Sequence, residues 1–210
     1  MIRMRPPKLA EKPVPVLSDD QIRLLLADCS GKDFRNRRDG AIIRLFLDTG
    51  IRLEGMSGLR YIADDPERSD VDLRSRVVRI TAKGRRELDL PIGAKSARDL
   101  DRYIRVRAAH SHASESWLRL GKKGRLAPSG VYQMIKDSGS AVGLPDLHPH
   151  QLRHTFSHDW PANGGSEGGL MRLAGWKSRA MLTRCAASAA DERAPPPIPR
   201  RPFLNNRHSP

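Results

Sequence analysis

Apolar residues near the N-terminus recur at the helical period of about 3.6 residues. Ser18, followed by two aspartates, supplies an N-cap and an acidic first turn for a helix that runs through Leu25. A longer helix with a strongly apolar second half is predicted over residues 36–48. Gly50 is expected to end it, and a short helix is expected to begin near Arg52.

The middle of the chain changes to the two-residue alternation that is typical of β-strands. Three short strands are predicted between turns rich in basic residues: 71–73, 77–80 and 87–90. Helical spacing returns after Gly93, and helices in the last third are predicted over 149–160, 166–173 and 178–186. Pro161 is expected to bend or end a helix near Trp160, because proline lacks an amide hydrogen. The predicted fold class is mainly α with a small antiparallel β-sheet (α+β).

The two ends of the chain differ in composition from the part between them. Residues 1–13 are basic and rich in proline, which predicts an extended arm. Residues 194–210 combine proline and arginine without hydrophobic periodicity, which is typical of a disordered tail. One folded domain is therefore predicted over residues 14–193, a length that can bury a substantial core.

The chain carries 38 Lys and Arg residues against 24 Asp and Glu residues, a formal net charge of +14 with a pI of about 10.6. This excess favours a polyanionic partner, nucleic acid first, although a merely soluble basic surface is the alternative. A membrane partner is not expected, because no apolar run approaches the ~20 residues that a spanning helix needs. Cys29 and Cys185 form no CxxC pair or disulfide framework, which predicts a reducing, cytoplasmic location.

Two basic residues in the first half are candidates for contact with a phosphate. Arg52 follows Thr49-Gly50-Ile51 at a helix start, where its guanidinium can present a planar pair of donors. Lys83 lies between two predicted strands, and a hairpin tip there can carry its ammonium group to a ligand. Taken alone, Arg52 is better explained as an ordinary surface arginine of a helix, and basic hairpin turns such as that of Lys83 are common solvated features.

A histidine-rich segment provides a second group of candidates. Pro149 fits the first position of a helix, on which His150 and Arg153 are i,i+3 neighbours that can share one phosphoryl oxygen. His150, with the histidines at 154 and 158, also suggests a metal site. However, Gln151 stands where the zinc-protease pattern has glutamate, and no metal is expected. Capped-helix histidines without a function are the other alternative.

Two further residues lie near the C-terminus of the predicted domain. The indole N–H of Trp176 can donate to a phosphate, although an anchor in the core is an equally ordinary role for this residue. Cys185 by itself reads as a small buried thiol.

Taken in order, four segments resemble the catalytic domain of the tyrosine recombinase (phage integrase) family. They are TGIRLEGMSGL (49–59), VVRITAKGRRELDLPIG (77–93), HPHQLRHTF (148–156) and LAGWKSRAMLTRC (173–185). The resemblance covers about residues 14–193. It is specific because four separate motifs occur in the family's order.

The resemblance assigns six catalytic positions: Arg52, Lys83, His150, Arg153, Trp176 and Cys185. The first four match the family's two arginines, hairpin lysine and His-x-x-Arg histidine. Trp176 stands where most members have histidine. The nucleophilic tyrosine of the family falls nine residues after that position, and this chain has Cys185 there.

The resemblance also implies a reaction. The tyrosine attacks a DNA phosphodiester and forms a 3′-phosphotyrosyl link, and attack by a strand hydroxyl then rejoins the DNA. The arginines stabilise the charge that develops on the phosphate. The covalent link conserves the bond energy, so no cofactor and no small-molecule substrate are expected. The implied partner is double-stranded DNA in the bacterial nucleoid, with several copies of the chain assembled on it.

Several departures from the family pattern weaken the expectation of activity. Cys185 ends at a sulfur atom that lies several ångströms short of a tyrosine hydroxyl, and a misplacement of ~1 Å can cost about 10²-fold in rate. Gly55 stands where the family usually has an acidic residue, and Glu54 beside it points about 100° away on a helix. The family's N-terminal clamp domain and basic C-terminal ending are not recognised in this sequence.

The sequence therefore predicts an integrase-type catalytic domain that binds DNA but is impaired in cleavage, as expected of a truncated and decaying copy. A non-catalytic DNA-binding remnant or regulator is the alternative. An unrelated basic RNA-binding or structural protein is a third possibility, and it requires the six positions to be scattered in space.

Overall fold

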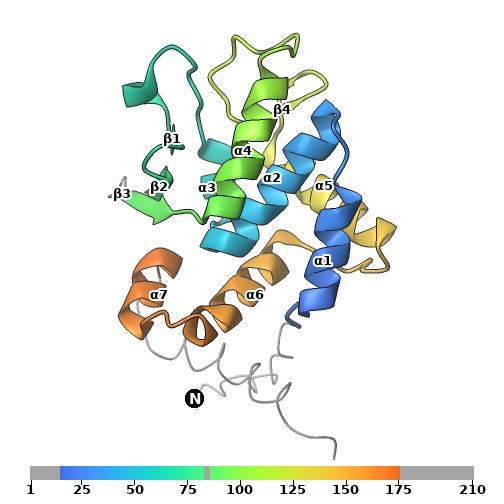
Figure 1. Ribbon diagram of the computed structural model, residues 1–210, viewed down its shortest axis with the longest axis vertical. Coiled ribbons are helices and arrows are strands. Elements are labelled where there is room, and N and C mark those ends of the chain that lie inside the picture. The colour runs from blue at the N-terminus through green and yellow to red at the C-terminus, as the bar shows by residue number, and fades with distance from the viewer. Residues whose placement is uncertain (1–14, 83–85, 176–210) are drawn as a thin grey trace, which may run out of the picture.

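The long apolar helix predicted before Gly50 forms the centre of the structure as α2 (Phe34–Thr49) (Figure 1). Asp33 caps its start, because one carboxylate oxygen accepts a hydrogen bond of 3.1 Å from the amide of Asn36. Gly50 ends the helix in the left-handed conformation, with φ 59°. Local residues thus define both ends of the helix on which the rest of the domain packs.

The computed structural model describes residues 15–82 and 86–175. Its other helices are α1 (Asp19–Asp28), α3 (Leu53–Gly58), α4 (Ala94–Arg107), α5 (Pro128–Ala141), α6 (Pro149–Ala162) and α7 (Glu167–Ala174), with a 3-10 turn at Pro66–Arg68. The strands are β1 (Val71–Asp72), β2 (Val77–Ala82), β3 (Arg86–Pro91), β4 (Leu120–Gly121) and β5 (Gly124–Arg125). This arrangement confirms the predicted fold class, mainly α with small antiparallel sheets.

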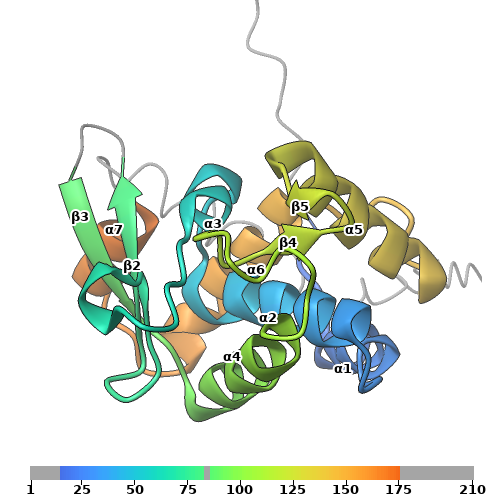
Figure 2. The same cartoon turned by 90° about the horizontal axis from the view of Figure 1, so that it is seen from above.

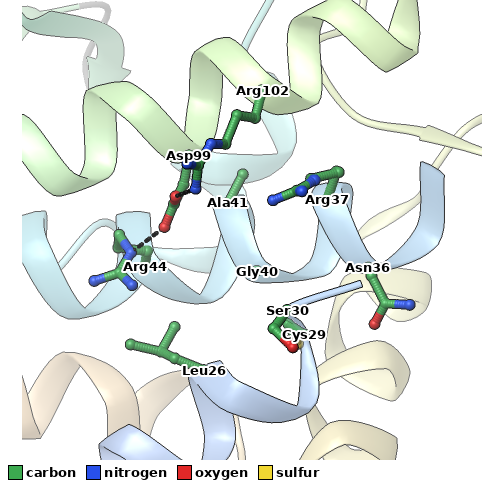
Figure 3. Close-up of a pocket in the computed structure, with 10 residues that line it drawn as sticks. All are labelled: Leu26, Cys29, Ser30, Asn36, Arg37, Gly40, Ala41, Arg44, Asp99 and Arg102. Carbon is green, nitrogen blue, oxygen red and sulfur yellow. Dashed lines mark hydrogen bonds and ion pairs between the residues drawn. The ribbon is translucent and has the colours of Figure 1, made fainter. Parts of the chain in front are cut away.

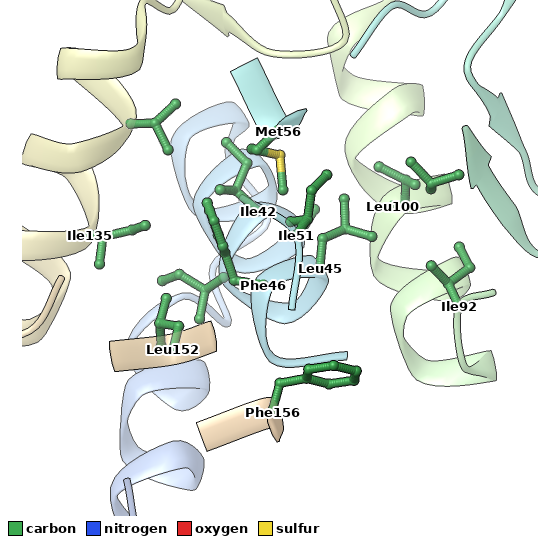
Figure 4. Packing of buried hydrophobic residues seen from close by; sticks show 14 of the residues in the cluster. Ile42, Leu45, Phe46, Ile51, Met56, Ile92, Leu100, Ile135, Leu152 and Phe156 are labelled. Atoms are coloured by element: carbon green, nitrogen blue, oxygen red, sulfur yellow. The ribbon is translucent and has the colours of Figure 1, made fainter. Parts of the chain in front are cut away.

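Helix α2 is covered by helices from three other parts of the chain. Phe46 on α2 is fully buried, and Figure 4 shows Leu152 of α6 beneath it. In the same view Ile135 of α5 and Leu100 of α4 lie on opposite sides of α2. Because α4 and α6 both pack on α2, the segments that precede and follow the sheet are held in one core.

The three predicted strands form one antiparallel sheet in the order β1-β2-β3. Val78 pairs with Val71 on one side and Leu90 on the other, and all three side chains are buried. The alternation seen in the sequence therefore defines the buried face of the sheet correctly. Helix α3 packs against β2, so the sheet adjoins the segment that begins at Arg52.

The helix that contains Pro161 ends close to it, in agreement with the expectation. Helix α6 continues two residues past Trp160 to Ala162, and the amide of Asn163 still donates to the carbonyl of Asp159 at 3.1 Å. Proline is tolerated because it lies in the last turn, where its missing amide hydrogen costs a single intrahelical hydrogen bond.

A second hairpin, formed by β4 and β5, was not predicted from the sequence. Each strand has two residues, too few for an alternating pattern to be visible. Arg119, next to β4, is fully buried, and Arg107 at the end of α4 is 3% exposed. Part of the basic excess is therefore internal rather than available to a partner.

The predicted arm, the predicted helix over 178–186 and the predicted tail all lie outside the described residues. Within the described ranges, no helix is both long enough and apolar enough to cross a membrane.

We predict that Gly50→Ala lowers the free energy of unfolding by about 2–5 kcal/mol. The new methyl group would meet an unfavourable φ, and it would also overlap the Phe156 ring. Gly143→Ala is the matched control, since Gly143 has φ 81° but nothing within 4 Å of an added methyl group. It should cost only about 1–2 kcal/mol. Urea unfolding of both variants measures the difference, and equal losses would contradict the proposed overlap.

Candidate functional site

A tight turn between α2 and α3 presents Arg52. The Thr49 hydroxyl donates to the Leu45 carbonyl at 2.6 Å and accepts a hydrogen bond of 3.2 Å from the Ile51 amide. The left-handed Gly50 then reverses the chain. Arg52 occupies the N-cap position of α3 with extended backbone angles, and its side chain is exposed.

Arg52 and Arg153 converge on one main-chain oxygen at the end of α7. The Ala174 carbonyl accepts a hydrogen bond of 2.7 Å from Arg52 Nη2 and another of 2.5 Å from Arg153 Nη2. Arg153 Nη1 also donates to the Gly50 carbonyl, and Arg52 Nη2 lies 3.5 Å from the Gly175 carbonyl. The turn before α3, the middle of α6 and the end of α7 therefore meet at two guanidinium groups.

The two arginines differ in what they offer to a ligand. Arg153 is 7% exposed, and both of its terminal nitrogens donate to carbonyls. Arg52 is exposed, and within the described residues no acceptor binds its Nε or Nη1. Arg52 therefore keeps two donor groups, Nε and Nη1, that can bind phosphate oxygens. Arg153 contributes a buried positive charge behind it.

The end of α7 fits closely against Arg52. Gly175 has φ 59°, and a methyl group added there would lie 3.0 Å from Arg52 Nη1. The sequence shows a glycine after a predicted helix, which indicates a C-cap but not this contact. The role of the Ala174 carbonyl could not be predicted from the sequence, because every residue has a main-chain carbonyl and the residue type gives no sign of this one.

Histidines at the start of α6 lie beside Arg153. His148 caps the helix, because its Nδ1 accepts a hydrogen bond of 3.0 Å from the Gln151 amide. His150 is exposed, and its Nε2 lies 3.0 Å from His154 Nε2. One of these two rings must donate and the other accept, so the pair is compatible with two neutral imidazoles.

Electrostatics favour that neutral form. Burial, together with the positive charge of Arg153 and the nearby His148, lowers the pKa of His150. Burial and the neighbouring His150 lower the pKa of His154 to about 4, with a further contribution from Arg153. His154 is therefore uncharged at neutral pH, and the shift at His150 favours its uncharged form as well. His150 can act as a hydrogen-bonding group rather than as a third cation. The role of His154 was not predicted from the sequence.

The metal alternative gains no support from the geometry of the described chain. Among residues 15–82 and 86–175, no three His, Cys, Asp or Glu side chains are grouped so as to hold a metal ion. His158, the third histidine of the i+4 series, has its Nδ1 at 3.1 Å from Asp159 Oδ1 instead.

Helix α3 is held in place by two arginines that the sequence did not single out. Arg119 donates to the Met56 carbonyl at 3.1 Å and also to the Ser57 carbonyl, which accepts a further bond of 2.9 Å from Arg125. Burial and the charge of Arg125 lower the pKa of Arg119 to about 10, so it stays charged at neutral pH. These contacts satisfy the last carbonyls of the helix that begins after Arg52.

Gly55 lies on the side of α3 that faces the sheet. A methyl group added there would lie 3.2 Å from Ile51 Cγ1 and 3.7 Å from Ile80 Cδ1. The neighbouring Glu54 is exposed. The Cβ of an acidic residue at position 55 would therefore lie among apolar side chains. Its carboxylate would have to extend past these side chains to approach Arg52.

Three predicted site residues cannot be placed. Lys83, Trp176 and Cys185 lie outside the described residues. The strands on either side of Lys83 pair as expected, with Ala82 opposite Arg86. The described chain ends at Gly175, directly before Trp176. The structure thus brings together Arg52, Arg153 and the neighbourhood of His150.

Comparison with known proteins gives a consistent result. Residues 15–192 match the model of the phage integrase family. The tyrosine recombinase XerC of Azotobacter vinelandii is 34% identical over 155 residues, 73% of this chain and 49% of the relative. The tyrosine recombinase XerC 1 of Ralstonia nicotianae is 31% identical over 187 residues, 83% of this chain and 56% of the relative. The chain spans about half the length of these relatives.

Solved structures share the fold. The crystal structure of XerA recombinase superposes with a TM-score of 0.71 at 24% identity, covering 85% of this chain and 63% of XerA. XerH site-specific recombinase, in a post-cleavage complex with a palindromic difH substrate, gives a TM-score of 0.68 at 16% identity. The match covers 86% of this chain and 52% of XerH. With the family model matched over most of its residues, the chain belongs to the phage integrase family.

Proposed function

We propose that this chain is the catalytic domain of a tyrosine-type site-specific recombinase, that it binds double-stranded DNA, and that Cys185 impairs strand cleavage. One observation carries the proposal. Arg52 and Arg153 donate to the same Ala174 carbonyl. Arg153 also binds the Gly50 carbonyl, which is 103 residues away in the sequence. The fold thus concentrates two cations at one place, as a phosphodiester requires.

The proposed phosphate position lies at the Nε and Nη1 groups of Arg52. Within the described residues neither group donates to the protein, so each can donate a hydrogen bond to a phosphodiester oxygen. The buried charge of Arg153 adds electrostatic stabilisation from behind, where the dielectric constant is low. His150, whose uncharged form is favoured, is a candidate for a further hydrogen bond to the phosphate. By the family match, Lys83 and Trp176 are the remaining residues proposed to contact the phosphodiester.

The remaining steps follow the family chemistry. Attack on phosphorus forms a bond to the protein and releases a 5′-hydroxyl, which the family match assigns Lys83 to protonate. The covalent link keeps the energy of the phosphodiester, so the reverse attack by a hydroxyl can rejoin strands. XerH has been solved both before and after cleavage of difH. The fold it shares with this chain supports the same type of reaction at the same type of site.

Cys185 is the position at which this chain departs from an active site. The thiol ends at Cβ–Sγ, whereas a tyrosine places its oxygen beyond a whole ring. The sulfur therefore falls several ångströms short of a phosphorus that Arg52 positions, and such a displacement suppresses attack strongly. The proposal is accordingly that DNA binding is retained and covalent chemistry is impaired.

The proposed organisation keeps the boundaries read from the sequence: a basic arm over residues 1–13, the catalytic domain over 14–193 and a tail over 194–210. We further propose that several copies assemble on DNA in the bacterial cytoplasm, because strand exchange requires more than one cleaved strand. The +14 charge of the chain supports binding to a polyanion such as DNA.

Restoring the tyrosine tests the proposed role of Cys185. We expect no covalent DNA adduct from the wild-type chain on a duplex with a suicide nick, and a weak adduct from Cys185→Tyr. The added ring restores both reach and a phenolic oxygen. Cys185→Phe is the matched control, because it adds the ring without the hydroxyl and should stay silent. Denaturing gels with labelled DNA measure the adduct, and an adduct from the wild type that is lost in Cys185→Ala would refute the proposal.

DNA binding should depend steeply on salt. Affinity for a duplex should fall about a hundredfold or more between ~50 and ~200 mM salt, because phosphate contacts release condensed counterions. Arg52→Gln should reduce the slope of log Kd against log salt by about 1. Arg105→Gln is the control, since Arg105 lies on α4 and pairs with Asp101 at 2.9 Å. Fluorescence anisotropy measures the slopes, and a flat titration or equal effects of both variants would contradict the proposed contact.

A further inference from the structure

An open cavity of about 170 Å³ lies between the C-terminal end of α1, residues 36–44 of α2, and α4 (Figure 3). Figure 2 shows α4 on one side of α2 and α3 on the other. The cavity therefore lies across α2 from the segment that begins at Arg52. A DNA phosphate bound at Arg52 does not occupy it, and the proposed recombinase chemistry gives it no role.

Basic side chains dominate the charged lining of the cavity. Arg37, Arg44 and Arg102 line it, and Asp99 is the acidic residue among the residues that line it. Asp99 divides its carboxylate between two of them: one oxygen accepts from Arg44 Nε, and the other lies 3.4 Å from Arg102 Nη1. Three guanidinium groups around one carboxylate leave two positive charges in excess.

Arg37 carries the least compensated of these charges. Within the described chain, no carboxylate or carbonyl accepts a hydrogen bond from its guanidinium, which extends toward Asp99 in Figure 3. Arg44 lies seven residues further on the same face of α2, two turns away. Gly40 stands between them, and an added methyl group there would lie 3.2 Å from Cys29 Cβ. The glycine lets α1 approach closely and adds no side chain between the arginines.

We propose that this cavity binds a phosphate-class oxyanion, either inorganic phosphate or the phosphoryl end of a small molecule. Guanidinium groups match the geometry of phosphate oxygens and donate two hydrogen bonds each. The donors are Arg37 and the terminal nitrogens of Arg44, which donate to no acceptor within residues 15–82 and 86–175, and Arg102 closes the α4 side. Asp99 keeps two of the arginines in place through its paired oxygens. The inference is independent of the proposed recombinase function, because it uses none of the residues at the Arg52 site.

Amide NMR of the full chain, titrated with inorganic phosphate at constant ionic strength, tests the proposal. The amides of Gly40 and Ala41, which line the cavity, should shift and saturate below about 10 mM phosphate. Glycerol 3-phosphate is the second probe. A tighter apparent Kd for it identifies a phosphorylated small molecule as the ligand, whereas an equal or weaker Kd identifies free phosphate.

Variants separate the cavity from the DNA site. Arg37→Gln should weaken phosphate binding at these amides about tenfold or more, through loss of a charged hydrogen bond. Arg35→Gln is the matched control: it removes the same charge from the same helix, at a side chain that does not line the cavity. Arg52→Gln should leave the shifts unchanged while it weakens DNA binding. If Arg37→Gln does not fold, Arg102→Gln serves in its place.

Three outcomes would overturn the proposal. One is the absence of saturable shifts at Gly40 and Ala41. Another is an equal loss of phosphate binding in Arg35→Gln, which would mean diffuse attraction to a basic surface. The third is a loss of duplex binding in Arg37→Gln as large as that in Arg52→Gln, which would make the cavity part of the DNA contact. A failure of the recombinase proposal alone appears differently, as absent duplex binding with the phosphate shifts intact.

Discussion

The carbonyl oxygen of Ala174 is the point on which the proposed site depends. It accepts hydrogen bonds from Arg52 and Arg153, and so joins the turn after α2, the helix α6 and the end of α7. A helix C-terminus carries a partial negative charge, so two guanidinium groups at this end are electrostatically favourable. The same contacts reduce the repulsion between the two cations. A pair of arginines can therefore be preorganised before any phosphate arrives.

The arginines of this chain fall into groups with different physical roles. Arg107 and Arg119 are buried and donate to main-chain carbonyls, which makes them part of the framework. Arg52 is exposed, and Arg37 lines a separate cavity. A formal charge of +14 therefore overstates the charge that is available to a partner. The arrangement of the guanidinium groups, rather than their number, determines where an anion can bind.

Much of the fold was predictable because local signals and hydrophobic period agreed. The cap at Ser18, the apolar stripe of α2 and the alternation around Val78 each led to the observed element. The features that were not predicted are those for which the local sequence carries no signal. The β4–β5 hairpin is too short for a period, and the Ala174 acceptor belongs to the main chain. The site was recognised through motif order and not through geometry, which is why Arg153 could be named but its burial could not.

Arg52 donates to the end of α7 through Nη2, and within the described residues its Nε and Nη1 donate to no other group. A phosphate at these two groups and the Ala174 carbonyl would share the same guanidinium charge. The two interactions would then be linked: the effect of a bound phosphate on the Arg52–Ala174 contact equals the effect of that contact on phosphate affinity. The position of α7 would in this way be coupled to whether the proposed phosphate position is filled.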